Sequence, residues 1–420
     1  MSMDAARGAY RPRILDALLE GRLASSGAVV IEGAKGTGKT ETARQKAASV
    51  AFLDTDVQLR QMLEVDPSLV LEGARPRLLD EWQVAPELWN HVRRAVDEAR
   101  EPGQFILTGS ATPSDDRTRH SGAGRFARLR LRTLTMYETG DSPGTVSLRS
   151  LLAGEAARAP ATDMDLRGLV ARMVRGGFPG AVDLPHAAAV RFNSDYLDQI
   201  SRVDIDFDDR LDHDPAKVST LLRSLARNTA TEARVATLVS DVAGADGGPS
   251  RSTVERYLAS LRKVFILEEQ PAWSPGIRSA AVLRTAPKRH LVDVCLAAAA
   301  LNVDETRLMR DLNTLGLFFE SFVHQHLLAY AAVVDAHVFH YRDSNGLEVD
   351  AVIQTRAGDW VAAEVKLGPG QVDAAAERLL KLAKLVDGQP AAGLVVIVPT
   401  GFAYTRQDGV RVVPLSLLGP

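Results

Sequence analysis

The sequence predicts an α/β fold in three parts: a parallel sheet covered by helices, a helical middle, and a smaller α/β region at the carboxyl end. Short apolar runs alternate with helical patterns over residues 28–108, which is typical of parallel sheets covered on both faces. From about residue 150 the pattern becomes mostly helical, and after a linker near residue 275 strand-like runs return. We therefore expect domains at 1–150, 151–275 and 276–420.

Composition excludes several protein classes. The chain has 420 residues, 45% of them hydrophobic, with a net charge of −3 and one cysteine, Cys295. A disordered or disulfide-stabilised chain is excluded, and a reducing, cytoplasmic location is expected. The longest apolar stretch, 294–301, is shorter than the about 18 residues that span a bilayer, so we expect no membrane segment. Nine lysines stand against 41 arginines, so each lysine merits inspection.

The expected elements follow from periodicity and from turn residues. In the first domain we expect strands at 28–34, 51–57, 77–79 and 105–108, with helices at 41–49 and 86–100. In the second we expect helices at 166–174 and 187–200, then a winged helix-turn-helix over 215–271. In the third we expect helices at 315–331 and 372–386, with strands at 337–342, 347–354, 360–367 and 394–399.

A glycine-rich loop lies between the first strand and its helix. It matches the phosphate-loop pattern in full with Gly33, Ala34, Lys35, Gly36, Thr37, Gly38, Lys39 and Thr40. The glycines allow backbone N–H groups to surround phosphates, and the helix amino terminus adds partial positive charge. Lys39 is expected to reach the β- and γ-phosphates, and the Thr40 hydroxyl to bind Mg²⁺. The loop predicts ATP or GTP as ligand, the alternative being a glycine turn that matches by chance.

Two adjacent acids supply the second half of a hydrolytic site. Asp80 and Glu81 follow the strand at 77–79, at the sheet edge where ligands gather in open α/β folds. Asp80 is expected to hold the water shell of the metal, and Glu81 to orient and deprotonate the attacking water. The alternative is a charged strand end. Adjacent acids on a phosphate-loop fold indicate water as the acceptor of the phosphoryl group.

Further candidates follow the next two strands. The strand at 105–108 ends in hydroxyls, and either Thr108 or Ser110 is expected to help place the water, unless both only cap the strand end. Arg125 follows Gly122 and Gly124 and is a candidate arginine finger. A solvated arginine face on an edge strand suits the later arginines at positions 128, 130 and 132 better.

These motifs together resemble the predicted AAA+ ATPases of bacteria and archaea whose carboxyl-terminal domain has a restriction-endonuclease-like fold. The matching segments are the phosphate loop, 79–81, 107–110, 124–125, 176–179, the winged-helix stretch, 341–343 and 364–366. The resemblance implies an ATPase module whose hydrolysis depends on oligomers. One departure is Gly36, where relatives often carry a bulkier residue; it leaves the phosphate contacts intact and alters the stiffness of the loop.

The carboxyl-terminal region carries the order of residues found in nucleases of this type, Asp followed by Glu-x-Lys. Asp350 and Glu364 are expected to hold Mg²⁺ against a scissile phosphate, with Lys366 stabilising charge and Glu320 on the preceding helix. The alternative is a fold with surface acids and no metal. A two-residue turn at 357–358 would point Asp350 away from Glu364, so the active-site interpretation requires an odd-length loop or a bulge.

Two functional hypotheses remain open. The first is an ATP-hydrolysing homo-oligomer with a nuclease-like end that acts on DNA or on a DNA-bound partner. The second is a nucleotide-switched DNA- or protein-binding regulator whose end domain is a non-catalytic scaffold. The basic side chains around the expected recognition helix permit phosphate contacts, although a solvated face explains them equally well: Arg251, Arg256, Arg262 and Lys263.

Overall fold

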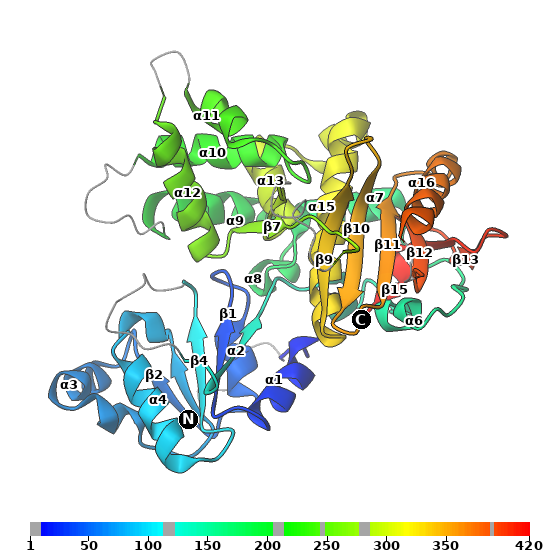
Figure 1. Ribbon diagram of the computed structural model, residues 1–420. Coiled ribbons are helices and arrows are strands. Elements are labelled where there is room, and N and C mark those ends of the chain that lie inside the picture. The colour runs from blue at the N-terminus through cyan, green and yellow to red at the C-terminus, as the bar shows by residue number, and fades with distance from the viewer. Residues whose placement is uncertain (1–9, 112–121, 205–213, 244–247, 277–285, 387–389) are drawn as a thin grey trace. The chain divides into compact units, whose positions relative to one another are not determined.

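A computed structural model of the chain describes residues 10–111, 122–204, 214–243, 248–276, 286–386 and 390–420. It separates into two compact units (Figure 1). Unit 1 comprises Met1–Arg132 with Lys263–Phe265, and unit 2 comprises Thr133–Arg262 with Ile266–Pro420. The helical middle and the carboxyl-terminal α/β region that the sequence predicts thus fall within one compact unit, and their division at residue 275 stays a prediction.

Unit 1 is built on a parallel sheet of five strands in the order β2-β3-β4-β1-β5. The strands are β1 (Ala28–Glu32), β2 (Ser49–Phe52), β3 (Arg77–Asp80), β4 (Phe105–Gly109) and β5 (Phe126–Arg130). The helices are α1 (Leu15–Leu23), α2 (Lys39–Arg44), α3 (Val57–Val65) and α4 (Leu88–Ala99), with 3-10 turns at Pro67–Leu71 and Trp82–Val84. Side chains of α4 pack on one face of the sheet and those of α1 on the other. The predicted parallel sheet covered on both faces is confirmed.

The second strand was placed wrongly by sequence. The expected strand at 51–57 is β2, which ends at Phe52, and α3 begins at Val57. The reason is local, because the Asp56 carboxylate accepts hydrogen bonds from the backbone N–H groups of Gln58 and Leu59 and thereby caps a helix. Residues 51–57 therefore comprise the end of a strand, a turn and the start of a helix.

The helical part of unit 2 follows the predicted order. It contains α5 (Met136–Thr139), β6 (Val146–Ser147), α6 (Leu148–Leu152), α7 (Leu166–Arg175), α8 (Pro179–Val182), α9 (His186–Gln199), a π-turn (Ile200–Asp204), α10 (Pro215–Arg227), α11 (Val235–Ala243), α12 (Arg251–Lys263), β7 (Leu267–Gln270), β8 (Lys288–Leu291), α13 (Val294–Leu301) and α14 (Glu305–Arg310). Three helices, α10 to α12, precede the antiparallel pair β7–β8. Because β8 lies beyond the expected stretch 215–271, the winged helix stays a prediction.

The glycine pair that begins the 176–179 segment has a packing role. A Cβ atom on Gly177 would lie 2.2 Å from the carbonyl oxygen of Leu134, and one on Gly176 would lie 2.3 Å from Sγ of Cys295. The Gly177 N–H also donates to the buried carboxylate of Asp293, which caps α13. This motif therefore brings two backbone segments into close contact inside unit 2.

The carboxyl-terminal part of unit 2 is a mixed sheet in the order β13-β14-β12-β11-β10-β9. Its elements are α15 (Leu312–Val333), β9 (Ala336–Arg342), β10 (Glu348–Thr355), β11 (Trp360–Val365), a 3-10 turn (Pro369–Gln371), α16 (Val372–Leu385), β12 (Gly393–Val398), β13 (Tyr404–Thr405), β14 (Arg411–Pro414), a 3-10 turn (Leu415–Leu417) and β15 (Leu418–Gly419). β9, β10 and β11 are antiparallel, and β12 joins β11 in parallel. The predicted order of helix, three strands, helix and strand is present. In the described ranges, no helix combines the length and apolarity needed to cross a membrane.

Candidate functional site

The phosphate loop follows β1 and leads into α2. Gly36 and Gly38 have φ angles of 74° and 93°, a left-handed backbone that glycine adopts without steric cost. Lys39 is buried, and its Nζ donates to the carbonyl oxygen of Ala34 at 2.9 Å, which also accepts from the Thr37 hydroxyl. Lys35, by contrast, is exposed. Lys39, which the sequence analysis assigned to the phosphates, thus makes a hydrogen bond within the loop.

Burial lowers the pKa of Lys39 to about 8, although the nearby carboxylates of Glu81 and Asp80 act in the opposite direction. A lysine with this pKa still carries its charge at neutral pH. An anionic ligand in the loop would compensate the desolvated ammonium, which is the electrostatic requirement of a phosphate site.

Asp80 is held by two hydroxyls at the carboxyl ends of the central strands. The register pairs β3 and β4 so that Asp80 and Thr108 end at the same level. Asp80 Oδ1 accepts from the hydroxyls of Thr40 at 2.8 Å and Thr108 at 2.5 Å. Burial raises the pKa of Asp80, and these two hydrogen bonds oppose the rise. The sequence-predicted Thr40 and Asp80 are thus in direct contact.

Glu81 is placed by a sharp turn. Its φ of 55° is left-handed, which is uncommon outside glycine, and it turns the chain from β3 into the 3-10 turn at Trp82–Val84. The Glu81 N–H donates to Thr108 Oγ1 at 3.2 Å, and Ser110 Oγ donates to Glu81 Oε2 at 3.0 Å. Thr108 and Ser110, which the sequence left as alternatives, therefore both contact the acid pair.

Sequence reasoning missed two residues of this site. Gln83 Nε2 contacts Glu81 Oε2 and donates to Ser110 Oγ at 3.1 Å. Arg13 donates to the carbonyl oxygen of Thr37 at 2.8 Å and to that of Arg132 at 2.7 Å. The position of Gln83 two residues after Glu81 was a usable signal, whereas one arginine among 41 carries none.

Arg125 lies at the other edge of the sheet from the phosphate loop. Its carbonyl accepts from the N–H of Ala28, the first residue of β1, whereas the loop follows the last residue of that strand. About 13 Å of strand separates the two levels. The Arg125 guanidinium pairs with Asp97 at 2.8 Å. A finger role for Arg125 therefore requires the site of a second subunit.

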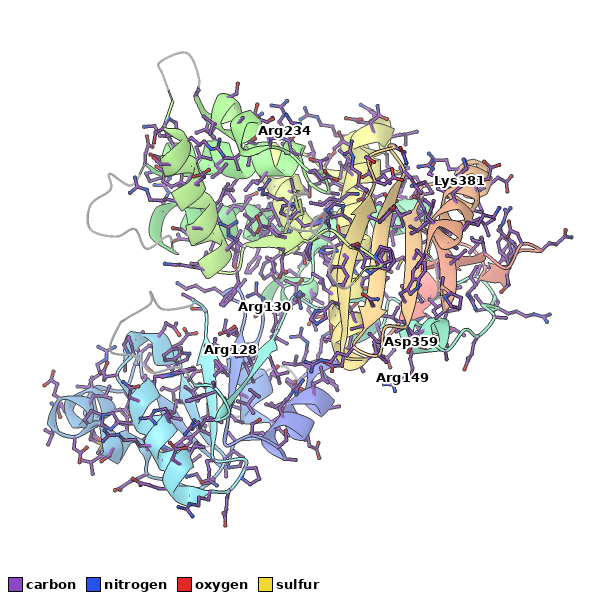
Figure 2. The ribbon with its side chains drawn as sticks, in the orientation of Figure 1. Arg128, Arg130, Arg149, Arg234, Asp359 and Lys381 are labelled. Carbon is purple, nitrogen blue, oxygen red and sulfur yellow. The ribbon has the colours of Figure 1, made fainter. Side chains whose placement is uncertain are left out.

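The other arginines of this segment differ from one another. Figure 2 labels Arg128 and Arg130. Arg128 is exposed and pairs with Glu32, and the charge of Arg130 lowers the pKa of Lys39. The solvated face expected for the series at 128, 130 and 132 thus holds for Arg128, while Arg130 and Arg132 are half-buried.

The residues of the loop fit a Mg²⁺-nucleotide. The Thr40 hydroxyl and the Asp80 carboxylate are neighbouring oxygen ligands of the kind that Mg²⁺ prefers. The loop glycines Gly36 and Gly38 hold the left-handed backbone, and Lys39 supplies a desolvated positive charge. These features match the ligand predicted from the sequence.

The predicted carboxyl-terminal residues Asp350, Glu364 and Lys366 also lie close together. The register of β10 and β11 pairs Ala351 with Ala363 and Gln354 with Trp360, so a three-residue loop at 356–358 joins them. The predicted odd-length loop is confirmed, and Asp350 lies on the same face as Glu364. Lys366 Nζ lies 2.9 Å from Asp350 Oδ2 and 2.6 Å from Glu364 Oε2.

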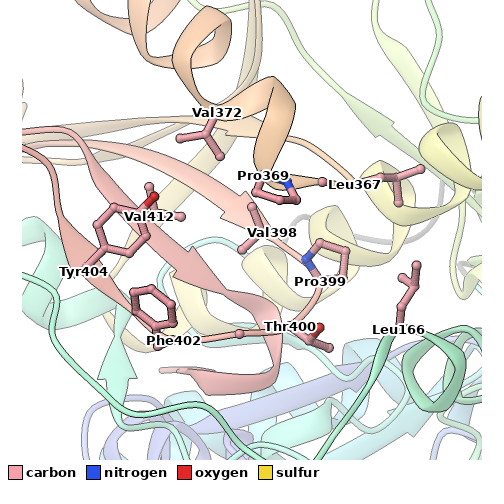
Figure 3. A pocket seen from close by; sticks show the side chains of 12 residues that line it. Leu166, Leu367, Pro369, Val372, Val398, Pro399, Thr400, Phe402, Tyr404 and Val412 are labelled. Carbon is pink, nitrogen blue, oxygen red and sulfur yellow. The ribbon is translucent and has the colours of Figure 1, made fainter.

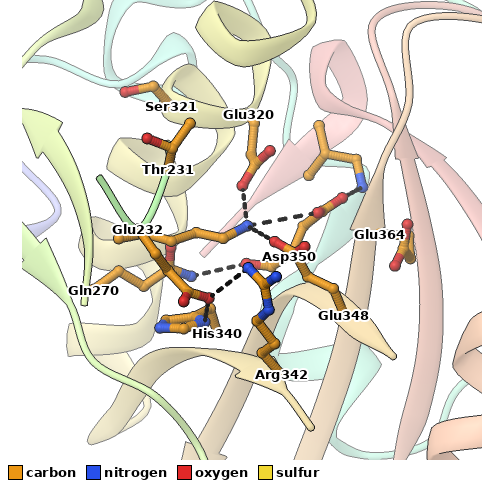
Figure 4. A network of polar contacts seen from close by, with 12 residues as sticks. Thr231, Glu232, Gln270, Glu320, Ser321, His340, Arg342, Glu348, Asp350 and Glu364 are labelled. Atoms are coloured by element: carbon orange, nitrogen blue, oxygen red, sulfur yellow. Dashed lines mark hydrogen bonds and ion pairs between the residues drawn. The ribbon is translucent and has the colours of Figure 1, made fainter. Parts of the chain in front are cut away.

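A second lysine, which the sequence analysis did not assign, lies among these acids. Lys288 of β8 is 2% exposed, and its Nζ lies 2.7 Å from Glu320, 3.0 Å from Glu348 and 3.8 Å from Asp350 (Figure 4). The described part of the chain contains no group of three or more His, Cys, Asp or Glu residues that could hold a metal ion. Each acid predicted here contacts an ammonium group instead. The scarcity of lysine in the sequence was the signal that could have found Lys288.

Burial and charge determine the protonation of this cluster. Burial raises the pKa of Glu320 to about 8 and that of Glu364 to about 7, and repulsion from Asp350 adds to both. Burial alone would raise the pKa of Asp350, but Lys366 and Lys288 lower it. For Lys288, the three carboxylates outweigh burial and raise the pKa. The cluster contains two lysines and four acids. Because the raised pKa values of Glu320 and Glu364 favour their neutral forms, the net charge of the cluster approaches zero.

The network continues along β9. His340 Nδ1 and Arg342 both lie 3.6 Å from Glu232 Oε1 (Figure 4). Burial lowers the pKa of His340 to about 4, and the charge of Lys288 adds to this. His340 is therefore neutral at pH 7, and Arg342, which is 50% exposed, is the charged partner of Glu232.

Unit 2 also contains an apolar hollow of about 310 Å³ near the carboxyl ends of β11 and β12 (Figure 3). Leu166, Pro369, Val398, Phe402 and Tyr404 line it, and none of its lining residues is charged. Because it holds no charged group, we assign it no reaction.

The basic residues of α12 are partly neutralised. Arg251 pairs with Glu255 at 2.9 Å, and Arg262 pairs with Glu269 at 2.9 Å. Exposed pairs of this type favour the solvated-face interpretation over a dedicated phosphate-binding surface.

Comparison with known proteins finds three matching family models. Residues 25–140 match an AAA domain, 166–307 match a domain of unknown function (DUF8612), and 315–418 match another (DUF4143). Uncharacterized proteins of Mycobacterium bovis and Mycobacterium tuberculosis are each 25% identical over 339 residues, which are 78% of this chain and 67% of each relative.

Two solved structures show weaker likeness. The Walker-type ATPase of Pyrococcus abyssi has 12% identity and a TM-score of 0.43, covering 68% of this chain and 94% of that one. The ORC1 protein of Aeropyrum pernix in complex with DNA has 13% identity and a TM-score of 0.27, covering 73% and 96%. Both TM-scores are low, so the comparison rests on the family match. The amino-terminal region is similar to AAA domains, and its parallel sheet has the α/β fold of a P-loop ATPase.

Proposed function

We propose that the chain is a Mg²⁺-dependent ATP hydrolase. The observation that carries this proposal is the convergence of Thr40, Asp80, Thr108 and Glu81 at the carboxyl ends of β1, β3 and β4, beside the phosphate loop. A nucleotide-binding loop alone would not require a second acid. The match of residues 25–140 to an AAA domain supports the same function.

Each residue has a defined task in this proposal. Lys39 exchanges the Ala34 carbonyl for phosphate oxygens, Thr40 and Asp80 hold the metal and its waters, and Glu81 takes a proton from the attacking water. Bound Mg²⁺ supplies neutralisation of the charge on the phosphate groups. Thr108 keeps Asp80 and the backbone of Glu81 in fixed relation.

Nucleotide binding is the first test. Equilibrium binding of a fluorescent ATP analogue should require Mg²⁺ for full affinity and should be lost in Lys39→Ala. Lys35→Ala is the matched control, because Lys35 is the exposed lysine of the same loop. Equal affinity of all three proteins would contradict the proposal.

For the carboxyl-terminal region we propose a non-catalytic scaffold. The observation that supports it is Lys288, whose ammonium group contacts two of the acids predicted for a metal site, Glu320 and Asp350. A metal-dependent phosphodiesterase is the second candidate, because Asp350, Glu364 and Lys366 converge as that chemistry requires.

DNA cleavage decides between these two candidates. We expect no cleavage of supercoiled plasmid or of single strands with Mg²⁺ or Mn²⁺, with or without ATP. Cleavage that is lost in both Asp350→Ala and Lys366→Ala, while ATP hydrolysis persists, would establish the phosphodiesterase. DNA as a partner stays a prediction, because ion pairs engage two of the basic side chains of α12. Assembly into a homo-oligomer belongs to the proposal through Arg125, which would act in the site of a second subunit.

A further inference from the structure

Glu81, the proposed base, is held by two neighbours that also contact each other. Ser110 Oγ donates to Glu81 Oε2 at 3.0 Å, Gln83 Nε2 contacts the same oxygen, and Gln83 Nε2 donates to Ser110 Oγ at 3.1 Å. The three side chains form a closed triangle. Both donors converge on one carboxylate oxygen, which leaves Oε1 as the oxygen that neither donor holds.

The direction of these hydrogen bonds follows from chemistry. An ionised carboxylate only accepts, so the Gln83 amide must turn its NH₂ group toward Glu81. That group has two hydrogens, which serve Glu81 and Ser110, and the single hydroxyl hydrogen of Ser110 then serves Glu81. Every donor in the triangle is used in support of an ionised Glu81.

The backbone is arranged to bring Gln83 to this place. The left-handed φ of Glu81 turns the chain back, and the Glu81 side chain makes no capping hydrogen bond to the 3-10 turn that it begins. A Cβ atom on Gly109 would lie 3.0 Å from Nε1 of Trp82 and 3.1 Å from Oε1 of Gln83. Glycine at the end of β4 therefore allows the turn bearing Gln83 to approach the strand closely.

We propose that Gln83 is a positioning residue for hydrolysis, which fixes Glu81 through Oε2 so that Oε1 is presented to the attacking water. This inference rests on the proposed ATPase function. A base misplaced by about 1 Å can lose about 100-fold in rate, so the expected effect falls on turnover. Nucleotide affinity depends on the loop and on Lys39, and it should not change.

The test replaces Gln83 with methionine, which has similar length and cannot donate. In the full chain, Gln83→Met should lower kcat about 10- to 100-fold, with KM and the affinity for a fluorescent ATP analogue within about threefold of wild type. Val84→Ala, in the same turn and 54% exposed, is the control for local disruption. In a Glu81→Gln background, Gln83→Met should cause no further loss, because the base it positions is already absent.

A second measurement does not depend on activity or on the folding of that variant. The side-chain amide protons of Gln83 should exchange slowly with water in an NMR spectrum of the nucleotide-free protein, and their signals should shift in Ser110→Ala. Unshifted signals, or a kcat of Gln83→Met within twofold of an active wild type, would overturn the role of Gln83 and leave the proposed ATPase function standing. A wild type that binds nucleotide and never hydrolyses it would overturn the proposed function as well.

Discussion

At the scale of single residues, the candidate ATPase site depends on groups whose partners come from distant parts of the chain. Asp80 and Glu81 stand together in sequence, yet Thr40, Thr108, Ser110 and Gln83 complete their environment. The sequence identified both acids together with Thr40, Thr108 and Ser110, because phosphate chemistry restricts residue type and spacing. It missed Gln83, although the position of this residue two after Glu81 was a usable signal, and it missed Arg13, because one arginine among 41 carries none.

Arg125 gives a prediction at this scale. In an oligomer, Arg125→Ala should lower turnover about 100-fold or more if the guanidinium reaches the phosphates of a neighbouring subunit, and ATP affinity should stay within a few-fold. Asp97→Asn is the matched variant, since it breaks the same ion pair and leaves the guanidinium in place. Equal loss in both variants, measured as specific activity against protein concentration, would show that only the ion pair matters.

At the scale of elements, the sequence predicted the order of helices and strands well where apolar periodicity was long, as in α15, β10, β11 and α16. It failed at β2, which ends at Phe52, because the rest of the expected strand forms a turn and the start of α3, which Asp56 caps. The β10–β11 loop was the most informative element. An odd or even number of loop residues decides whether Asp350 lies on the same face of the sheet as Glu364 or on the opposite face. Lys288 was missed because it is distant in sequence from the acids that it contacts, and the scarcity of lysine was the one signal that pointed to it.

Loop parity can be tested directly. Deleting Gly358 would shift the register by one residue and turn buried side chains of β10 or β11 to the other face, so we expect loss of cooperative thermal unfolding or of soluble protein. Inserting two residues after Gly358 keeps parity and should lower the unfolding temperature by only a few degrees. Similar behaviour of the two variants would argue against the register.

At the scale of the whole molecule, the chain combines an AAA-type unit with a unit whose buried acids are balanced by lysines. The folded-state pKa of Glu320 is raised from its ordinary value of 4.5 to about 8. Between these pH values the folded chain binds more protons than the unfolded chain, so the free energy of unfolding decreases as pH rises. Glu364, with a pKa raised to about 7, acts in the same direction.

The unfolding temperature of unit 2 should therefore fall between about pH 5 and pH 8. Glu320→Gln removes one of the two groups responsible and should flatten this dependence. Glu348→Gln, at a 40% exposed position that contacts the same lysine, should leave it largely unchanged. Calorimetry across this pH range is the measurement, and an identical slope in Glu320→Gln and wild type would contradict the assignment.

The central claim is that Glu81 activates water beside a nucleotide bound in the phosphate loop. The most direct measurement is phosphate release from ATP by wild type and by Glu81→Gln, with nucleotide affinity measured on the same preparations. The account predicts that wild type releases phosphate in the presence of Mg²⁺, and that Glu81→Gln binds ATP with similar affinity while losing hydrolysis about 100-fold or more. Undiminished phosphate release by Glu81→Gln would contradict it.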